Sequence, residues 1–319
     1  MDKNKIAVVD YNDYVNGNEK ERQQFIKDFG DSFSNMGFAI VRNHGVSKQL
    51  RKKLLEVSQE FFGLPTETKR QYEDVTNGGQ RGYVSKRRET AKGMDVPDIK
   101  EFYHIGPTVT DDDKIKDEYG DNVFAKEVEN FESTTQDVYN TFETTGRNLL
   151  KCIALYLGLE EDYFTPKIHN GNSVLRLLHY YPVEDKSQIP DGAVRAAAHG
   201  DINLITLLMG GSAEGLEAQT LDGEWIPVSP KDDEIVINIG DMLSRLTNNR
   251  LRSTQHRVIT PNEESWLTPR FSTPFFLHPR SDMDLSCLGT CVSEDNPKGY
   301  KDATAGEFLH ERLTELGLM

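Results

Sequence analysis

The feature that most constrains this chain is a succession of strand-like segments that begins at residue 173. Turn signals separate most of them, and no helical pattern lies between most of them. The segments read SVLRLLHYYP, NLITLLMGG, GLEAQT, GEWIPVSP, EIVINIG, STQHRVIT and RFSTPFFLHP. The Asp222-Gly223 pair between the third and fourth segments is a strong hairpin signal. Consecutive short strands of this kind predict an antiparallel sandwich or barrel.

The N-terminal part of the chain predicts a helical layer over that sheet. Phe25, Phe29 and Phe33 recur every four residues and mark one face of an amphipathic helix that Gly37 ends. A long helical pattern over residues 125–158 is expected to pack on the outside of the sheet. We therefore expect a mainly β fold with flanking α-helices.

Other segments complete this outline. The pattern KQLRKKLLEVSQEFFGL predicts a helix that ends near Pro65, and residues 74–100 read as a loop. Short strands are predicted at residues 6–9, 38–41 and 101–105. We divide the chain into an N-terminal region, 1–120, and a core, 121–319, expected to form one structural unit.

Charge and cysteine content narrow the class of protein. With 37 Lys and Arg against 52 Asp and Glu, the net charge is −15. This charge argues against non-specific binding to nucleic acid or to an anionic membrane. The N-terminal stretch MDKNKIAVVDYNDY has no apolar signal core. The odd number of cysteines, at Cys152, Cys287 and Cys291, favours a reducing compartment, so a cytoplasmic location is expected.

Two motifs carry candidate metal ligands. His199 and Asp201 stand two residues apart at the start of a strongly apolar run, and His256 lies in a later strand-like segment. Side chains two apart on an extended segment share one face. Two imidazoles and one carboxylate are the ligand set of non-haem Fe(II) oxygenases. On these three residues alone, a capped strand end and a satisfied core histidine would be the better explanation.

A second pair of residues changes that balance. Arg270 and Ser272 stand two apart in the segment RFSTPFF, fourteen residues after His256. The planar fork of an arginine matches a carboxylate bidentately, and the serine adds a hydroxyl donor. Metal-ligand candidates followed by such a clamp predict a site for a metal-chelating acid such as 2-oxoglutarate. The alternative for Arg270 is a surface salt bridge.

The chain resembles the 2-oxoglutarate and Fe(II)-dependent dioxygenases of the isopenicillin N synthase-like family. The motifs that carry this resemblance are HGD (199–201), QHRV (255–258), RFSTPFF (270–276), HYYP (179–182), NIGD (238–241), GFAIVRNHG (37–45) and FFGLPTETKRQY (61–72). They follow the family's order over almost the whole chain.

The resemblance implies a double-stranded β-helix, or jelly roll, with Fe(II), 2-oxoglutarate and O2 as cofactor and cosubstrates. Carried over by position, His199, Asp201 and His256 would ligate iron. Arg270 and Ser272 would hold the distal carboxylate of 2-oxoglutarate. Tyr181, which precedes Pro182, matches the family's tyrosine that donates to the same carboxylate.

Four further positions within or near these motifs give a weaker indication of function. His179 stands where many plant members have asparagine, and a satisfied core histidine is the favoured interpretation. Arg176 has the opposite strand parity from Tyr181, so it is only a weak candidate for the 2-oxoglutarate site. Asn238 and Asp241 are expected to shape the turn after a strand.

The substrate pocket is the least determined part of the prediction. Tyr83, Glu89 and Tyr103 occupy the place where family members line that pocket. A solvated loop is the competing explanation for the charge cluster in the segment QRGYVSKRRETAKG (80–93). By family analogy the partner is a small molecule (an amino acid, a peptide or a secondary metabolite), with neither nucleic acid nor membrane involved.

Three functions remain open on the sequence. The first is a 2-oxoglutarate-dependent oxygenase that hydroxylates, desaturates or cyclises a small molecule and releases succinate and CO2. The second is an iron-dependent oxidase of the isopenicillin N synthase type, which does not use 2-oxoglutarate. The third is a non-redox metal-binding barrel, either a hydrolase or a binder.

Overall fold

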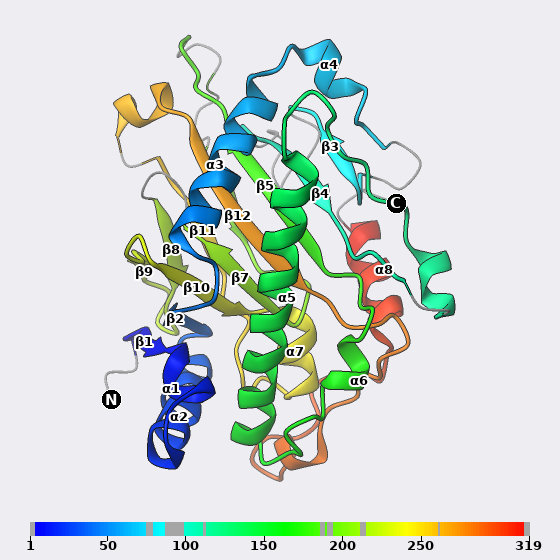
Figure 1. Cartoon of the computed structure of the whole chain (residues 1–319). Helices are drawn as coiled ribbons and strands as arrows, with labels where there is room; N and C mark the ends of the chain where they lie inside the picture. Colours follow the sequence, from blue (N-terminus) through cyan, green and yellow to red (C-terminus); the bar gives the residue numbers. More distant parts are fainter. Residues whose placement is uncertain are drawn as a thin grey trace.

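The computed structural model describes residues 4–74, 79–86, 99–110, 113–185, 189, 194–210, 215–260 and 262–315. Within these residues, two β-sheets lie together and helices cover one side of the larger sheet (Figure 1). The smaller sheet has the strand order β6-β11-β8-β9 and the larger one β1-β2-β10-β7-β12-β5-β4-β3. The strands of the larger sheet are β1 (Ala7–Asp10), β2 (Phe38–Arg42), β3 (Gly82–Val84), β4 (Glu101–Ile105), β5 (Val174–Tyr180), β7 (Ile205–Met209), β10 (Glu234–Ile239) and β12 (Arg270–Leu277). Those of the smaller sheet are β6 (Ala196–His199), β8 (Leu216–Gln219), β9 (Trp225–Pro227) and β11 (His256–Val258).

Strand pairing is antiparallel except between β1 and β2, which run parallel. The inner faces of the two sheets share one apolar cluster, to which Leu178 and Val236 contribute from the larger sheet and Ala218 and Val258 from the smaller one. The sandwich predicted from the strand succession is confirmed. At the predicted hairpin between β8 and β9, Gly223 has a φ of +85°.

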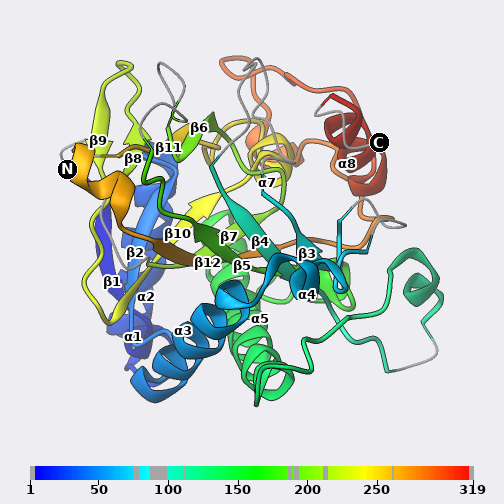
Figure 2. The same cartoon turned by 90° about the horizontal axis from the view of Figure 1, so that it is seen from above.

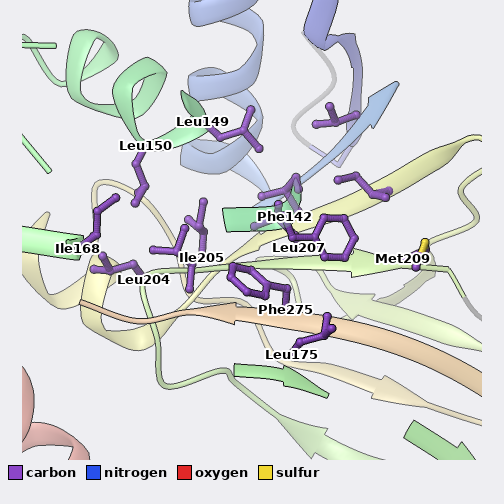
Figure 3. Packing of buried hydrophobic residues seen from close by; sticks show 14 of the residues in the cluster. Phe142, Leu149, Leu150, Ile168, Leu175, Leu204, Ile205, Leu207, Met209 and Phe275 are labelled. Atoms are coloured by element: carbon purple, nitrogen blue, oxygen red, sulfur yellow. The ribbon is translucent and has the colours of Figure 1, made fainter. Parts of the chain in front are cut away.

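The outer face of the larger sheet carries the main core beneath α5 (Phe131–Tyr156), which crosses β5, β12 and β7 (Figure 1). Apolar residues from α5, including Phe142 and Leu149, lie among side chains of these strands, such as Leu207 and Phe275 (Figure 3). A Cβ on Gly146 would lie 2.4 Å from Leu277 Cδ1, so the absence of a side chain lets the helix approach the sheet closely. The long helix predicted on the outside of the sheet is confirmed, and it begins six residues later than expected.

Further helices flank the sheets. They are α1 (Tyr11–Val15), α2 (Glu19–Asn35), α3 (Lys48–Gly63), α4 (Thr66–Arg70), α6 (Thr165–Ile168), α7 (Asp241–Leu246) and α8 (Ala305–Glu315), with short 3-10 turns at Lys114–Glu118, Glu263–Leu267 and Gly289–Cys291. Of these, α3 lies on the side of α5, and α7 and α8 lie on the side of β6 (Figure 2). Asn18 and Glu21 form a capping box at the start of α2, which satisfies backbone donors that the helix leaves open. Gly37 ends the helix with a φ of +71°, and a Cβ there would lie 2.3 Å from the Arg252 carbonyl oxygen.

The sequence located most elements but missed β3, which lies inside a segment predicted as a loop. This strand has only three residues and pairs along one edge with β4, so it carries too short a pattern to recognise. In the described part of the chain, no helix has the length and apolar character needed to cross a membrane.

Candidate active site

The three predicted metal ligands come together where the two sheets meet. In β6 and β11, His199 and His256 are direct partners across the strand pair, and their ring centroids lie 4.4 Å apart. Asp201 follows β6, and its Oδ1 lies 3.8 Å from His256 Nε2. One ligand atom from each residue lies within 4.8 Å of the others, a spacing suited to a single cation. Figure 2 shows β6 and β11 beside α7 at this end of the molecule.

Hydrogen bonds fix which atom each ligand presents. His199 Nδ1 bonds the Ala197 carbonyl at 2.8 Å, and His256 Nδ1 bonds the Thr254 carbonyl at 3.2 Å. A carbonyl only accepts, so Nδ1 carries the proton in each ring and Nε2 keeps its lone pair.

The carboxylate is oriented in the same way. Thr206 Oγ1 and Asn238 Nδ2 donate to Asp201 Oδ2 at 2.6 Å and 2.7 Å, which leaves Oδ1 on the side of His256. Asn238 therefore orients the Asp201 carboxylate, whereas the sequence predicted a turn-shaping role. The hydroxyl of Ser253 donates to Asp241 Oδ1 at 2.6 Å, beside the same loop.

The electrostatics of the site favour the ligand-competent protonation states. Burial alone would raise the pKa of Asp201, but the two imidazoles and the two hydrogen bonds outweigh it and lower the pKa. Part of His199 remains accessible to solvent, yet desolvation by surrounding protein atoms, assisted by His256, lowers its pKa to about 4. The carboxylate is thus ionised and this imidazole is neutral at pH 7.

The predicted anion clamp lies on the inner face of the larger sheet. Arg270 is 3% exposed, and its Nη1 donates to Ser272 Oγ at 3.2 Å. Desolvation by burial lowers the pKa of Arg270. Its guanidinium carbon lies 5.3 Å from the ring centre of Tyr180, its strand partner on β5.

A second buried guanidinium stands beside this clamp, and sequence reasoning missed it. Arg195, also 3% exposed, donates to the carbonyls of Ser265 and Thr268, the latter at 2.7 Å. Burial and the nearby charge of Arg270 lower the pKa of Arg195 to about 10. Two adjacent buried cations make this end of the sandwich electropositive, which favours an anion. The only signal was an arginine four residues before His199.

The two tyrosines of the HYYP motif have different neighbours. Tyr180 lies against Arg270, while the ring centre of Tyr181 lies 4.3 Å from Lys86 Nζ. The expectation followed the position before Pro182 in the family motif, but β5 ends at Tyr180 and its alternation sets the inner face. Arg176 shares that face with Tyr180.

Two of the three predicted substrate residues lie on the opposite, outer face of the sheet. Tyr83 and Tyr103 are 1% and 0% exposed, and both pack in the main core. Their hydroxyls donate to Glu101 Oε2 at 2.5 Å and to the Val123 carbonyl at 2.7 Å. Neither tyrosine therefore contributes a side chain to the inner face of the sheet. The third residue, Glu89, lies outside the described residues.

His179 belongs to a buried polar network on the same outer face. Glu101 accepts from His179 Nδ1 at 2.9 Å through one oxygen, and from Lys69 Nζ at 2.8 Å and the Tyr83 hydroxyl through the other. The ring of His179 stacks on Phe271 with centroids 4.6 Å apart. The satisfied core histidine favoured from the sequence is what the structure contains.

Comparisons with known proteins agree with this geometry. Residues 6–127 match the family of non-haem dioxygenase N-terminal regions described from morphine synthesis, and residues 171–279 match the 2OG-Fe(II) oxygenase superfamily. The proline hydroxylase buaE of Petromyces alliaceus is 30% identical, over 97% of this chain and 99% of that protein.

Solved structures share the fold. A 2OG-Fe(II) oxygenase family protein of Caulobacter crescentus is 43% identical with a TM-score of 0.87, over 98% of this chain and 99% of that chain. A Neurospora crassa protein, solved in complex with alpha-KG and thymine, is 29% identical with a TM-score of 0.85, over 97% of this chain and 96% of its own. The two packed sheets therefore form the double-stranded β-helix of this group. The chain belongs to the 2-oxoglutarate and Fe(II)-dependent oxygenases of the isopenicillin N synthase-like family and is an oxidoreductase of that type.

Proposed function

We propose that His199, Asp201 and His256 hold Fe(II), and that Arg270 and Ser272 hold the distal carboxylate of 2-oxoglutarate. The observation that carries the metal assignment is the orientation of the donors. Both histidines have Nδ1 committed to a backbone carbonyl, and Asp201 has Oδ2 committed to two donors. Nε2 of each ring and Oδ1 of the carboxylate form the remaining set, which fits the two-histidine, one-carboxylate iron site.

When bound, Fe(II) together with 2-oxoglutarate supplies the O2-dependent oxidising chemistry that no amino-acid side chain provides. The protein's part is to bind, to orient and to exclude water. Thr206 and Asn238 hold the Asp201 carboxylate still, so the ligand set is organised before metal arrives.

The clamp end of the site supports the cosubstrate assignment. Arg270 and Ser272 are 3% and 5% exposed, and a guanidinium in such a dry environment binds a carboxylate through short charge-assisted hydrogen bonds. Tyr180 lies against Arg270 and is the tyrosine best placed to join this contact, whereas Tyr181 lies next to Lys86. Arg195 adds a second positive charge nearby.

We further propose a small-molecule substrate in a cytoplasmic enzyme. Two similar proteins are described with small molecules, proline for the hydroxylase of Petromyces alliaceus and thymine for the Neurospora crassa complex. A site between two packed sheets suits a compact substrate better than a polymer.

The first test is spectroscopic. Anaerobic addition of Fe(II) and 2-oxoglutarate to the protein should produce a visible metal-to-ligand charge-transfer band that neither component gives alone. A protein that binds Fe(II) but never develops the band would contradict the cosubstrate assignment.

The second test separates the oxygenase from the oxidase of the same family. Succinate should form in step with O2 consumption, and substrate oxidation should stop when 2-oxoglutarate is withheld. Oxidation at full rate without 2-oxoglutarate would favour the oxidase and would reassign Arg270 to the substrate's own carboxylate.

A further inference from the structure

The segment that leads to His256 is bound to a distant part of the chain. His256 lies in the region that matches the oxygenase superfamily, whereas the turn between α2 and β2 (residues 36–38) lies in the region that matches the N-terminal family. The hydroxyl of Thr254 donates to the Met36 carbonyl at 2.8 Å, although the two residues are 218 positions apart. Thr254 is 4% exposed, so this hydrogen bond is buried and holds Thr254 against the end of α2.

Two further hydrogen bonds join the same segments. The backbone amide of Arg252 donates to the Phe33 carbonyl at 3.3 Å, and its Nη1 donates to the Asn35 carbonyl at 2.7 Å. Asn35 is the last residue of α2, where helix carbonyls have no partner inside the helix. The segment before His256 therefore supplies donors to the C-terminal end of this helix.

The turn between α2 and β2 allows the two segments to approach closely. A Cβ on Gly37 would lie 2.3 Å from the Arg252 carbonyl oxygen and 2.5 Å from Thr254 Oγ1. A side chain at this position would therefore displace the Thr254 hydroxyl from the Met36 carbonyl.

The same turn restrains the imidazole of His256 through two residues. The Thr254 carbonyl accepts from His256 Nδ1 at 3.2 Å, so the position of this carbonyl sets the direction of Nε2. Phe38, which is 1% exposed at the start of β2, contacts the same imidazole edge-on, with ring centroids 5.7 Å apart and an interplanar angle of 80°. The ring is thus held by a hydrogen bond at Nδ1 and by an aromatic contact.

We infer that Thr254 and Phe38 are positioning residues for His256, and that through them the N-terminal region sets how tightly the metal site binds Fe(II). This inference rests on the proposed function, in which His256 is a metal ligand. Outer partners of a metal-bound histidine fix its tautomer and ring orientation, and their loss typically lowers metal affinity about 10- to 100-fold. A backbone carbonyl cannot be removed by substitution, so the Thr254 side chain that anchors it is the group to change.

The test compares two buried threonines that make the same kind of hydrogen bond. Thr254→Val removes the donor to Met36 and keeps the shape of the side chain, and Thr254→Ser keeps the hydroxyl. Thr145→Val is the matched control, because Thr145 Oγ1 donates to the His44 carbonyl at 2.8 Å and the residue is 2% exposed. Thr145 lies on α5, which covers the outer face of the larger sheet.

Anaerobic equilibrium dialysis with Fe(II) alone is the first measurement, and urea unfolding of the metal-free proteins accompanies it. Thr254→Val should weaken Fe(II) binding at least about 10-fold. Thr145→Val should bind Fe(II) as wild type does, although both valine variants should lower the urea midpoint by comparable amounts. Thr254→Ser should recover most of the wild-type affinity.

Proton NMR of the Co(II)-substituted proteins is the second measurement. A metal-bound imidazole that keeps its Nδ1 proton gives a strongly shifted signal that disappears in D2O. The Nδ1 signal of His256 should change position in Thr254→Val and in Phe38→Leu, because each variant removes one of the two restraints on the ring, and it should stay in place in Thr145→Val. Phe38→Leu keeps the test decisive if Thr254→Val is poorly folded.

Three results would overturn the inference: Fe(II) binding by Thr254→Val as tight as by wild type, an equal loss of affinity in Thr145→Val, or no recovery in Thr254→Ser. Failure of the proposed function looks different, because wild type itself would then bind no Fe(II) or develop no charge-transfer band with 2-oxoglutarate.

Discussion

The two faces of the larger sheet both bury charged groups, but the charged groups on the two faces have different partners. On the outer face, Glu101 accepts from Lys69, Tyr83 and His179, so the charges of this network compensate each other within the protein. Between the inner face and the smaller sheet, the donor atoms of His199, Asp201 and His256 converge on one point, and hydrogen bonds from behind fix their direction. Mutual compensation maintains a fold, whereas convergence of oriented atoms prepares a site for a ligand.

The largest stability effect should come from the outer face. Glu101→Ala leaves Lys69, with a side chain 4% exposed, as a buried charge without its carboxylate. Breaking a buried pair in this way typically costs about 3–5 kcal/mol. Urea unfolding of the metal-free protein measures this loss.

Glu143→Ala is the control, because the Glu143–Arg147 pair has both side chains 29% exposed. Its loss should cost less than about 1 kcal/mol. Equal effects for the two variants would show that the buried network does not stabilise the fold more than a surface pair.

Substitutions on the inner face should change the affinity for 2-oxoglutarate instead of the stability of the fold. Arg270→Gln should weaken 2-oxoglutarate binding by about 2–5 kcal/mol, or roughly 30- to several-thousand-fold, while Fe(II) binding changes little. Ser272→Ala should cost about 1 kcal/mol, since it removes one neutral donor. Titration of the charge-transfer band with 2-oxoglutarate measures both, and an unchanged affinity in Arg270→Gln would remove this residue from the clamp.

A pH titration tests the contribution of one further buried group, His44, to the stability of the fold. Burial, with a smaller effect of Arg51, lowers the pKa of His44 from 6.5 to about 4, and the residue is 3% exposed. Between these values the unfolded chain binds more protons than the folded one, so the free energy of unfolding falls as the pH drops from 7 towards 4. His44 should account for roughly 2–3 kcal/mol of that fall.

His44→Phe should therefore lose less stability than wild type between pH 7 and pH 5. Denaturant unfolding at the two pH values gives the difference. An equal loss in both proteins would exclude His44 as a source of the pH dependence.

A further stability effect concerns how closely α5 approaches the outer face. Gly146→Ala puts a methyl group 2.4 Å from Leu277 Cδ1 and should cost about 1–3 kcal/mol. Gly63→Ala, at the end of α3 with nothing within 4 Å of the new atom, should instead stabilise by about 0.4–1 kcal/mol. Thermal denaturation distinguishes the two, and a stabilised Gly146→Ala would show that the helix has room to move away.

The sequence predicted those parts of the molecule that rest on local pattern. Strand-like segments separated by turn signals located β5, β7, β10 and β12, and the His-x-Asp spacing located two members of the His-Asp-His cluster. Tyr181 shows where such reasoning stops. The choice between Tyr180 and Tyr181 depends on where β5 ends and which face its alternation selects, and the motif before Pro182 does not contain that information.

Contacts between distant segments could not be predicted either. Arg195, just before β6 of the smaller sheet, comes near Arg270 on β12 of the larger sheet only through the packing of the fold, and no spacing between residues 195 and 270 encodes this. Tyr83 and Tyr103 were expected at the substrate, but pairing between β3 and β4 turns both towards the outer core.

The most direct test of the account compares iron binding with stability in Asp201→Ala. Wild type should bind one Fe(II) per chain in anaerobic equilibrium dialysis, and the variant should bind none. The metal-free variant should lose less stability than Glu101→Ala, because it removes the acceptor of two neutral donors, Thr206 and Asn238, and leaves no buried charge without its partner. Unweakened Fe(II) binding by Asp201→Ala, or a loss of stability as large as that of Glu101→Ala, would contradict the division between a ligand-binding inner face and a structural outer face.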